Sequence, residues 1–128
     1  MTKILIVDDD RNLTNLTKIA LVTKGFDVTV VHESLRVMEE LKKQKPDLIL
    51  MDIMMPKLSG GELVKLLRND PDLKNISVIF LTGLISGEED IEMEGINIEG
   101  SKYQSLGKPY EIGRLLKVME KTLSKVGR

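Results

Sequence analysis

The chain has 128 residues, of which 41% are hydrophobic, so it can form one domain with a buried core and is not a disordered chain. Its formal net charge of -1 argues against nucleic acid or an anionic membrane as a partner of this domain. The lack of cysteine excludes disulfide bonds and thiol chemistry, and no apolar run is long enough for a signal peptide or a membrane span. We therefore expect one domain over residues 1–128 of a soluble, cytoplasmic protein.

Four short apolar runs and one weaker, polar run are typical of strands, and a helical pattern follows each of them. The strands are predicted at 3–7, 27–31, 48–51, 76–81 and 103–106, and the helices at 11–24, 34–43, 59–68, 88–94 and 110–125. Residues 95–101 are predicted to be a loop. The first helix is predicted to bury one apolar stripe, consisting of Leu13, Leu16, Ile19, Ala20 and Val22.

The alternation of strands and helices predicts an α/β fold with a parallel sheet and helices on both faces. Because parallel crossovers are right-handed, few topologies remain. We expect a doubly wound five-stranded sheet of order 2-1-3-4-5, which is a flavodoxin-like three-layer sandwich. The fifth strand, 103–106, is polar and is therefore predicted to lie at an edge of the sheet.

Polar side chains stand where four of the predicted strands end. The first strand is followed by Asp8, Asp9 and Asp10, and the other functional candidates are Asp52, Thr82 and Lys108. Ligands of such sheets bind outside the carboxyl ends of the strands, so these residues are expected to share one crevice.

Carboxylates packed this closely repel one another unless a cation lies between them, and Mg²⁺ is the natural cation for such a site. A lysine and a hydroxyl beside them suit phosphoryl oxygens, so the set predicts phosphoryl transfer to a carboxylate. Simpler roles also exist: Asp10 is expected to cap the first helix. The only histidine, His32, is expected to be structural or solvated and away from this crevice.

These motifs together resemble the receiver domains of two-component response regulators, and the resemblance covers the whole chain. They comprise the run from Ile4 to Asp10, the run from Asp52 to Pro56 with Gly60 after it, Leu81-Thr82, and Lys108-Pro109-Tyr110. The resemblance implies that Asp52 accepts the phosphoryl group. It also implies a Mg²⁺ site formed by Asp9, Asp52 and the backbone carbonyl of Met54.

In the same family, Asp8 would act mainly through a metal-bound water, while Thr82 and Lys108 would hold the phosphoryl group. The donor would be a phosphohistidine on a sensor histidine kinase or on a histidine phosphotransfer protein. The domain would catalyse only its own phosphorylation and dephosphorylation, and it would not be an enzyme otherwise. It would act as a monomer or as a phosphorylation-dependent dimer, either as a stand-alone receiver or as part of a longer regulator.

The chain departs from the family pattern near the output switch, which lies on the face formed by helix 4, strand 5 and helix 5. The segment between Thr82 and Lys108 is longer than usual, Gly83 replaces an alanine, and Ser105 stands where an aromatic residue is normal. Two interpretations of Tyr103 follow: it serves as the switch aromatic, or it is an exposed edge residue and the switch works without an aromatic.

Three other functions compete with a phosphoacceptor. A haloacid dehalogenase-type phosphatase would use Asp8 and Asp10, but Asn12 breaks its motif and Asp52 is left without a role. A flavodoxin-like FMN binder would need a phosphate loop after the first strand, where this chain has three carboxylates that repel phosphate. A degenerate receiver would only bind partners, which the presence of all five site residues disfavours.

Overall fold

A six-stranded sheet forms the centre of the protein, as seen in a computed structural model that describes residues 2–83, 96–98 and 100–124. The strand order is β2-β1-β3-β4-β6-β5. The strands are β1 (Lys3–Val7), β2 (Asp27–Val31), β3 (Leu48–Asp52), β4 (Ser77–Thr82), β5 (Ile96–Ile98) and β6 (Ser101–Gly107). The first five strands in the order pair in parallel, so the predicted doubly wound α/β sheet of order 2-1-3-4-5 is confirmed, with β6 as its fifth strand.

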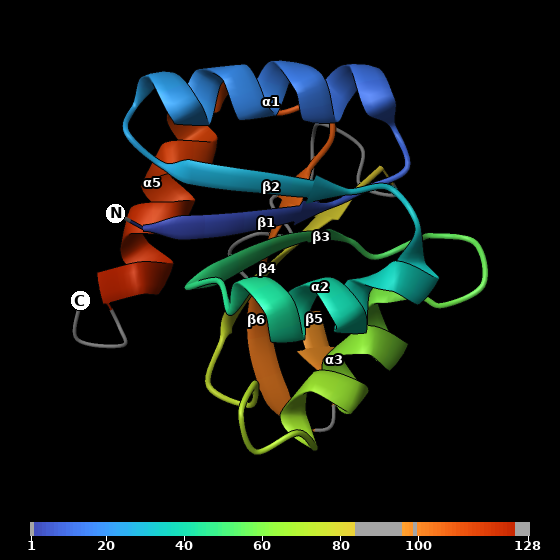
Figure 1. Cartoon of the computed structure of the whole chain (residues 1–128). Coiled ribbons are helices and arrows are strands. Elements are labelled where there is room, and N and C mark those ends of the chain that lie inside the picture. Colours follow the sequence, from blue (N-terminus) through green and yellow to red (C-terminus); the bar gives the residue numbers. More distant parts are fainter. Residues whose placement is uncertain (1, 84–95, 99, 125–128) are drawn as a thin grey trace.

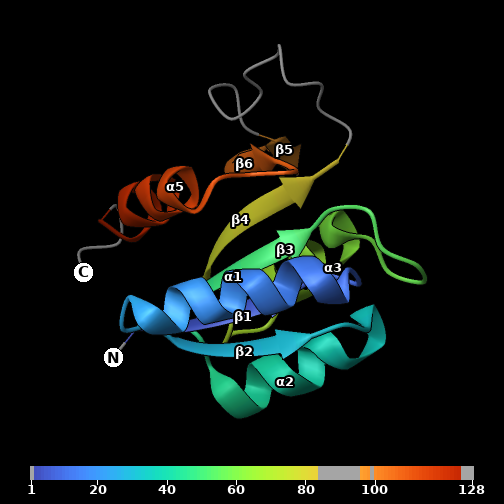
Figure 2. The same ribbon diagram turned by 90° about the horizontal axis from the view of Figure 1, so that it is seen from above.

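Helices cover both faces of this sheet, which gives the predicted three layers (Figures 1 and 2). The helices are α1 (Arg11–Thr23), α2 (Val37–Gln44), α3 (Gly60–Arg68) and α5 (Ile112–Ser124), with a short 3-10 helix, η1 (Ser34–Arg36), before α2. Over the described ranges, no helix has both the length and the apolar content needed to cross a bilayer. The predicted helix 88–94 lies outside the described residues.

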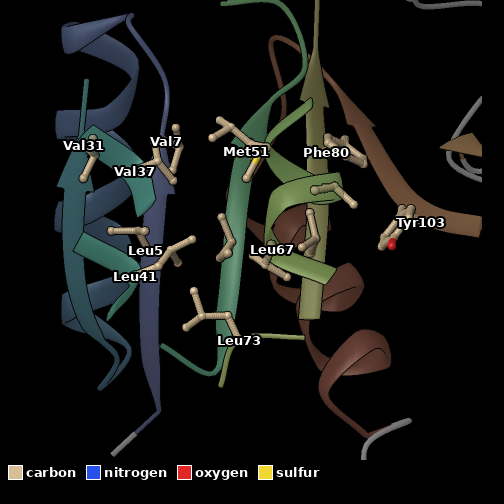
Figure 3. Packing of buried hydrophobic residues seen from close by; sticks show 14 residues of the cluster. Leu5, Val7, Val31, Val37, Leu41, Met51, Leu67, Leu73, Phe80 and Tyr103 are labelled. Carbon is tan, nitrogen blue, oxygen red and sulfur yellow. The ribbon is translucent and has the colours of Figure 1, made fainter. Parts of the chain in front are cut away.

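Side chains of the strands alternate between two cores, as a period of two requires. Leu5 and Val7 point into the core beneath α2 and α3, while Ile4 and Ile6 point into the core beneath α1 and α5. Figure 3 shows the first core, in which Leu41 and Leu67 from the helices meet strand residues. The residues of β3 alternate in the same way, with Ile49 and Met51 in the first core and Leu48 and Leu50 in the second, so both faces of β3 are apolar up to its last residue, Asp52.

The predicted apolar stripe of α1 is wrong for three of its five residues, while Leu13 and Ala20 are half-buried. Leu16, Ile19 and Val22 are exposed by 67%, 63% and 50%, whereas Leu21 and two threonines, Thr14 and Thr17, face the core. The threonine hydroxyls have partners, because Thr14 donates to the carbonyl of Arg11 and Thr17 bonds to the hydroxyl of Tyr110. Because these hydrogen bonds satisfy the hydroxyls, the threonine side chains can pack in the core as valine does. The spacing of apolar residues in the sequence cannot predict this, since threonine is counted as polar.

The edge of the sheet also differs from the prediction. Residues 96–98, expected to be part of a loop, form β5, which pairs antiparallel with β6. β5 covers residues 101–103 of β6, so the predicted edge strand at 103–106 is covered at Tyr103, while residues 104–106 pair only with β4 among the described residues. The hairpin satisfies backbone groups that an edge would leave open.

The start of α3 is set by a capping box and by the close packing of Gly60. Ser59 accepts a hydrogen bond from the backbone of Glu62, and Glu62 accepts one from the backbone of Ser59, which forms a capping box. The backbone of Gly60 packs tightly: a Cβ there would lie 3.0 Å from the carbonyl oxygen of Asp52 and 3.0 Å from Phe80. A Cβ on Gly61 would meet nothing closer than 3.9 Å.

Substitution of these two glycines is therefore expected to have opposite effects. Gly60→Ala should lower the free energy of unfolding by about 1–3 kcal/mol, because the new methyl group overpacks the end of β3. Gly61→Ala should leave stability unchanged or raise it by up to about 1 kcal/mol, since alanine is the better helix former. Urea unfolding followed by circular dichroism measures both, and equal losses would show that the close packing at Gly60 is not what matters.

Candidate functional site

Three carboxylates meet at the carboxyl ends of β1 and β3. Each of Asp8, Asp9 and Asp52 offers an oxygen, and these oxygens all lie within 4.8 Å of one another. Asp8 and Asp52 are buried, with 0% and 5% exposure, while Asp9 is exposed. Because hard carboxylate oxygens suit a divalent cation, this acidic triad could hold a metal ion.

Lys108 follows β6 and places its ammonium group among these carboxylates. Its Nζ lies 2.6 Å from Oδ2 of Asp8 and 3.1 Å from Oδ2 of Asp52. Its backbone N–H donates to the carbonyl of Thr82 at 2.8 Å, which ties the start of the β6–α5 loop to the end of β4. Residues 8, 52 and 108 are thus brought together from three strands, as the sequence predicts.

Hydrogen bonds to the backbone fix the acidic run that follows β1. Oδ1 of Asp10 accepts from the backbone of Leu13 and caps α1, so its predicted capping role is confirmed. Oδ1 of Asp8 accepts from the backbone of Asp10 at 3.0 Å, which fixes the turn after β1. Asp9 lies between them, with its side chain on the solvent side of the triad.

Asp52 is oriented by its own loop. Its Oδ1 accepts from the backbone N–H of Met54 at 3.0 Å, and its Oδ2 accepts from Lys108. The Met54 side chain is 61% exposed and does not pack into the core. Thr82, the last residue of β4, is 3% exposed and lies in register with Gly107 of β6, on the same edge as Asp52.

Burial raises the pKa of the Asp52 carboxyl above its ordinary value of 3.8, and the charge of Asp8 adds to the rise. The Met54 N–H and the Lys108 ammonium oppose it without cancelling it. The pKa of Lys108 is also raised: its burial acts to lower the pKa, but hydrogen bonds to Asp8 and Asp52 outweigh that effect. Without a bound cation, the ionised form of Asp52 is therefore less favourable in the folded chain than in the unfolded chain.

This difference predicts a pH dependence of stability in the presence of EDTA. A carboxyl whose pKa is raised by folding stabilises the fold while protonated, and that stability is lost as the pH rises from 3.8 through the raised pKa. Asp52→Asn abolishes this loss, so its stability advantage over the wild type should grow as the pH rises from acid to neutral. Urea unfolding across that range measures it, with the exposed Asp72→Asn as the control. An advantage independent of pH would contradict the assignment.

Two residues are placed differently from their sequence predictions. Nδ1 of His32 lies 3.0 Å from the backbone oxygen of Asp8, so His32 is structural, as one alternative held, but not remote from the site. Tyr103 is only 9% exposed, so its interpretation as an exposed edge residue is wrong. Its hydroxyl accepts from Nε of Arg68 at 2.9 Å, and its ring packs edge-to-face on Phe80.

Sequence reasoning missed Ser34, which belongs to the β2–α2 connection and contacts the β3–α3 connection. Its Oγ donates to the carbonyl of Pro56 at 2.7 Å and accepts from the backbone of Leu58 at 3.2 Å. These contacts join segments 22 and 24 residues apart in the sequence. The sequence holds no signal for this contact, because a serine at the start of a helical segment is expected to be only a cap.

Comparisons with known proteins agree with this geometry. Residues 4–120 match the family model described as the response regulator receiver domain. The chain is 30% identical over 128 residues to the DNA-binding dual master transcriptional regulator RpaA of Synechocystis sp., covering 100% of this chain and 52% of RpaA. It is 32% identical over 124 residues to the phosphate regulon transcriptional regulatory protein PhoB of Pseudomonas aeruginosa, covering 97% and 52%.

The fold has close counterparts among solved structures. A response regulator from Desulfuromonas acetoxidans superposes with a TM-score of 0.81 at 25% identity, over 98% of each chain. The chain spans about half the length of the two curated relatives, 52% in each case. The acidic pocket of Asp8, Asp9 and Asp52 is consistent with a phosphoacceptor aspartate and a metal site of two-component signalling. The chain belongs to the response regulator receiver domain family.

Proposed function

We propose that Asp52 is the phosphoacceptor of this receiver domain. One observation carries the proposal: Oδ2 of Asp52 lies at the end of the central strand β3, 3.1 Å from Nζ of Lys108 and within the acidic triad. The Asp52 carboxylate is buried, and its Oδ1 is held by the Met54 N–H. Its other oxygen, Oδ2, contacts Lys108 and is the oxygen that we propose to react.

The reaction is a transfer from nitrogen to oxygen. Oδ2 of Asp52 attacks the phosphorus of a phosphohistidine, the P–N bond breaks, and the electron pair leaves with the imidazole, which takes up a proton. Lys108 turns from the Asp52 carboxylate to a phosphoryl oxygen, and the hydroxyl of Thr82 donates to another. The product is an aspartyl phosphate.

The acidic triad fits Mg²⁺ as the cofactor of this step. Side chains of Asp9 and Asp52 and the backbone carbonyl of Met54 would hold the ion, and Asp8 would contribute through a water. The ion supplies neutralisation of the negative charge that three carboxylates and a phosphoryl group bring together. Lys108 supplies one positive charge to this site, which does not balance three carboxylates.

The partner class follows from the family: a receiver domain implies interaction with a histidine kinase. We propose a sensor histidine kinase or a histidine phosphotransfer protein as the phosphoryl donor, with the domain extending over residues 1–128 in the cytoplasm. The domain acts as a monomer or as a phosphorylation-dependent dimer. Family members are generally not enzymes in the usual sense, and the chemistry proposed here is limited to the domain's own phosphorylation and dephosphorylation.

A kinase-profiling experiment tests this function. The purified chain is mixed with Mg²⁺ and a set of autophosphorylated histidine kinases, and phosphoryl transfer is followed over time. Rapid transfer from one kinase, with one phosphoryl mass gained by the chain, is the expected result. A chain that gains none from any kinase or from acetyl phosphate would be a degenerate receiver that only binds partners.

We also propose Tyr103 as the aromatic residue of the output switch, in place of the missing aromatic at Ser105. Support comes from its burial beside Phe80, one strand away from Thr82, and from the Arg68 contact that a rearrangement would break. The chain has two tyrosines and no tryptophan, so Tyr110→Phe isolates the emission of Tyr103. Adding beryllofluoride and Mg²⁺ should change this emission and its quenching by iodide. Unchanged emission would remove Tyr103 from the switch; Tyr103→Phe, which retains Tyr110, is the control.

A further inference from the structure

The connection between β3 and α3 contains a strained turn at Pro56, Lys57 and Leu58. The backbone N–H of Leu58 donates to the carbonyl of Pro56, two residues earlier, at 2.9 Å. The central residue, Lys57, has a φ of +74°. A bond from residue i+2 to residue i around a φ of about +75° defines the rare and strained form of the γ-turn. Lysine carries a Cβ and is disfavoured in this region, which glycine occupies freely.

Ser34 holds both ends of this turn through one oxygen atom. Its hydroxyl donates to the carbonyl of Pro56 at 2.7 Å, and the N–H of Leu58 donates to the same Oγ at 3.2 Å. Ser34 is 5% exposed, so water competes little for these bonds. Strained backbone persists only where its surroundings determine it, and this hydroxyl is the side chain that contacts the turn at both ends.

Ser34 is itself anchored to the sheet and to α2. It begins η1, and its carbonyl accepts from the backbone of Val37. Val31 at the end of β2 and Val37 at the start of α2 are both buried in the core under α2 and α3. In Figure 1 the segment leaving β2 lies beside the loop that leaves β3, where these hydrogen bonds join them. The Ser34 hydroxyl therefore has a fixed position relative to the sheet and α2.

The strained turn lies close to the metal-binding residues. Met54, whose carbonyl is a proposed ligand, stands two residues before Pro56, and its N–H bonds to Oδ1 of Asp52. At the other end, the N–H of Gly60 donates to the carbonyl of Ile53 at 3.0 Å. The main chain of Met54 thus lies between the Asp52 side chain on one side and the turn held by Ser34 on the other.

We infer that Ser34 is a positioning residue of the metal site: it holds the strained turn and through it sets the direction of the Met54 carbonyl relative to Asp52. This inference rests on the proposed Mg²⁺ site. It adds a residue from the β2–α2 connection to a site otherwise built from the ends of β1, β3, β4 and β6. Residues that orient metal ligands typically affect metal affinity by about 10–100-fold when lost.

A double-mutant cycle between Ser34 and Lys57 tests it. Ser34→Ala should weaken Mg²⁺ binding about tenfold by calorimetry. If the hydroxyl acts by holding the strained turn, glycine at position 57 removes the need for it. In the Lys57→Gly background, Ser34→Ala should therefore weaken Mg²⁺ binding by no more than about threefold. Ser105→Ala is the matched control, since Ser105 is also buried but its Oγ has no hydrogen-bond partner among the described residues.

Phosphorylation by acetyl phosphate adds a readout that a purely structural role would not produce. Ser34→Ala should be phosphorylated slowly at low Mg²⁺ and at nearly the wild-type rate at saturating Mg²⁺, because Asp52 and Lys108 are intact. If the single variant is too unstable to measure, the Lys57→Gly background still tests the inference, because a tenfold loss of Mg²⁺ affinity on adding Ser34→Ala to that background would contradict it.

Two results would overturn the inference: unchanged Mg²⁺ affinity in Ser34→Ala, or an equal loss in both backgrounds. A wild-type chain that binds no Mg²⁺ would instead count against the proposed function.

Discussion

Asp52→Asn is expected to abolish phosphorylation. With acetyl phosphate and Mg²⁺, the wild-type chain should gain one phosphoryl mass, and the variant should gain none. Asparagine can keep the hydrogen bond from the Met54 N–H to Oδ1, and Lys108 can keep its contact with Asp8, so the site stays folded. Only the nucleophilic oxygen is lost, because an amide lacks the negative charge that attacks phosphorus. Intact-protein mass spectrometry measures the result.

The exposed Asp72→Asn is the matched control, because it makes the same chemical change away from the sheet edge. It should be phosphorylated like the wild type. A phosphoryl mass retained in Asp52→Asn would place the modification elsewhere, and peptide mapping would then identify the true acceptor.

Substitutions of neighbouring aspartates are expected to separate metal binding from helix capping. Asp9→Ala should weaken Mg²⁺ binding by about tenfold or more, because it removes an oxygen of the acidic triad. Its effect on stability should be small, since the side chain is exposed. Mg²⁺ titration by calorimetry gives the affinity.

Asp10→Ala is the matched partner and should behave in the opposite way. It should cost about 1 kcal/mol of unfolding free energy, because Oδ1 of Asp10 caps the backbone of Leu13. Its Mg²⁺ affinity should remain close to that of the wild type. If both variants lose Mg²⁺ affinity equally, the assignment of the acidic run to metal and cap is wrong.

The placement of the site was predictable from local pattern alone. Asp52 follows a continuously apolar run, and such a run belongs in a parallel sheet buried on both faces. Once the predicted strands 3–7, 48–51, 76–81 and 103–106 are taken as parallel neighbours, their carboxyl ends must meet at one edge. This is why the sequence alone groups Asp8, Asp52, Thr82 and Lys108.

The sequence predicted less well which helix residues are buried. The spacing of apolar residues shows where they lie on a helix, but it does not show which face of the helix packs on the sheet. On α1, threonines at positions 14 and 17 take the inward positions that leucine and isoleucine were expected to fill. The docked face depends on which groups across the interface can satisfy a hydroxyl, as Tyr110 does for Thr17.

The sequence by itself therefore determined the order of elements, the parallel sheet, and the residues gathered at its carboxyl edge. These follow from spacings within single strands and from the few topologies that parallel crossovers allow. Only the tertiary structure decided the antiparallel strand β5, the burial of Tyr103 against Arg68, and the contact of Ser34 with Pro56. The last two join side chains to partners 35 and 22 residues away, and no local propensity encodes a partner at that distance.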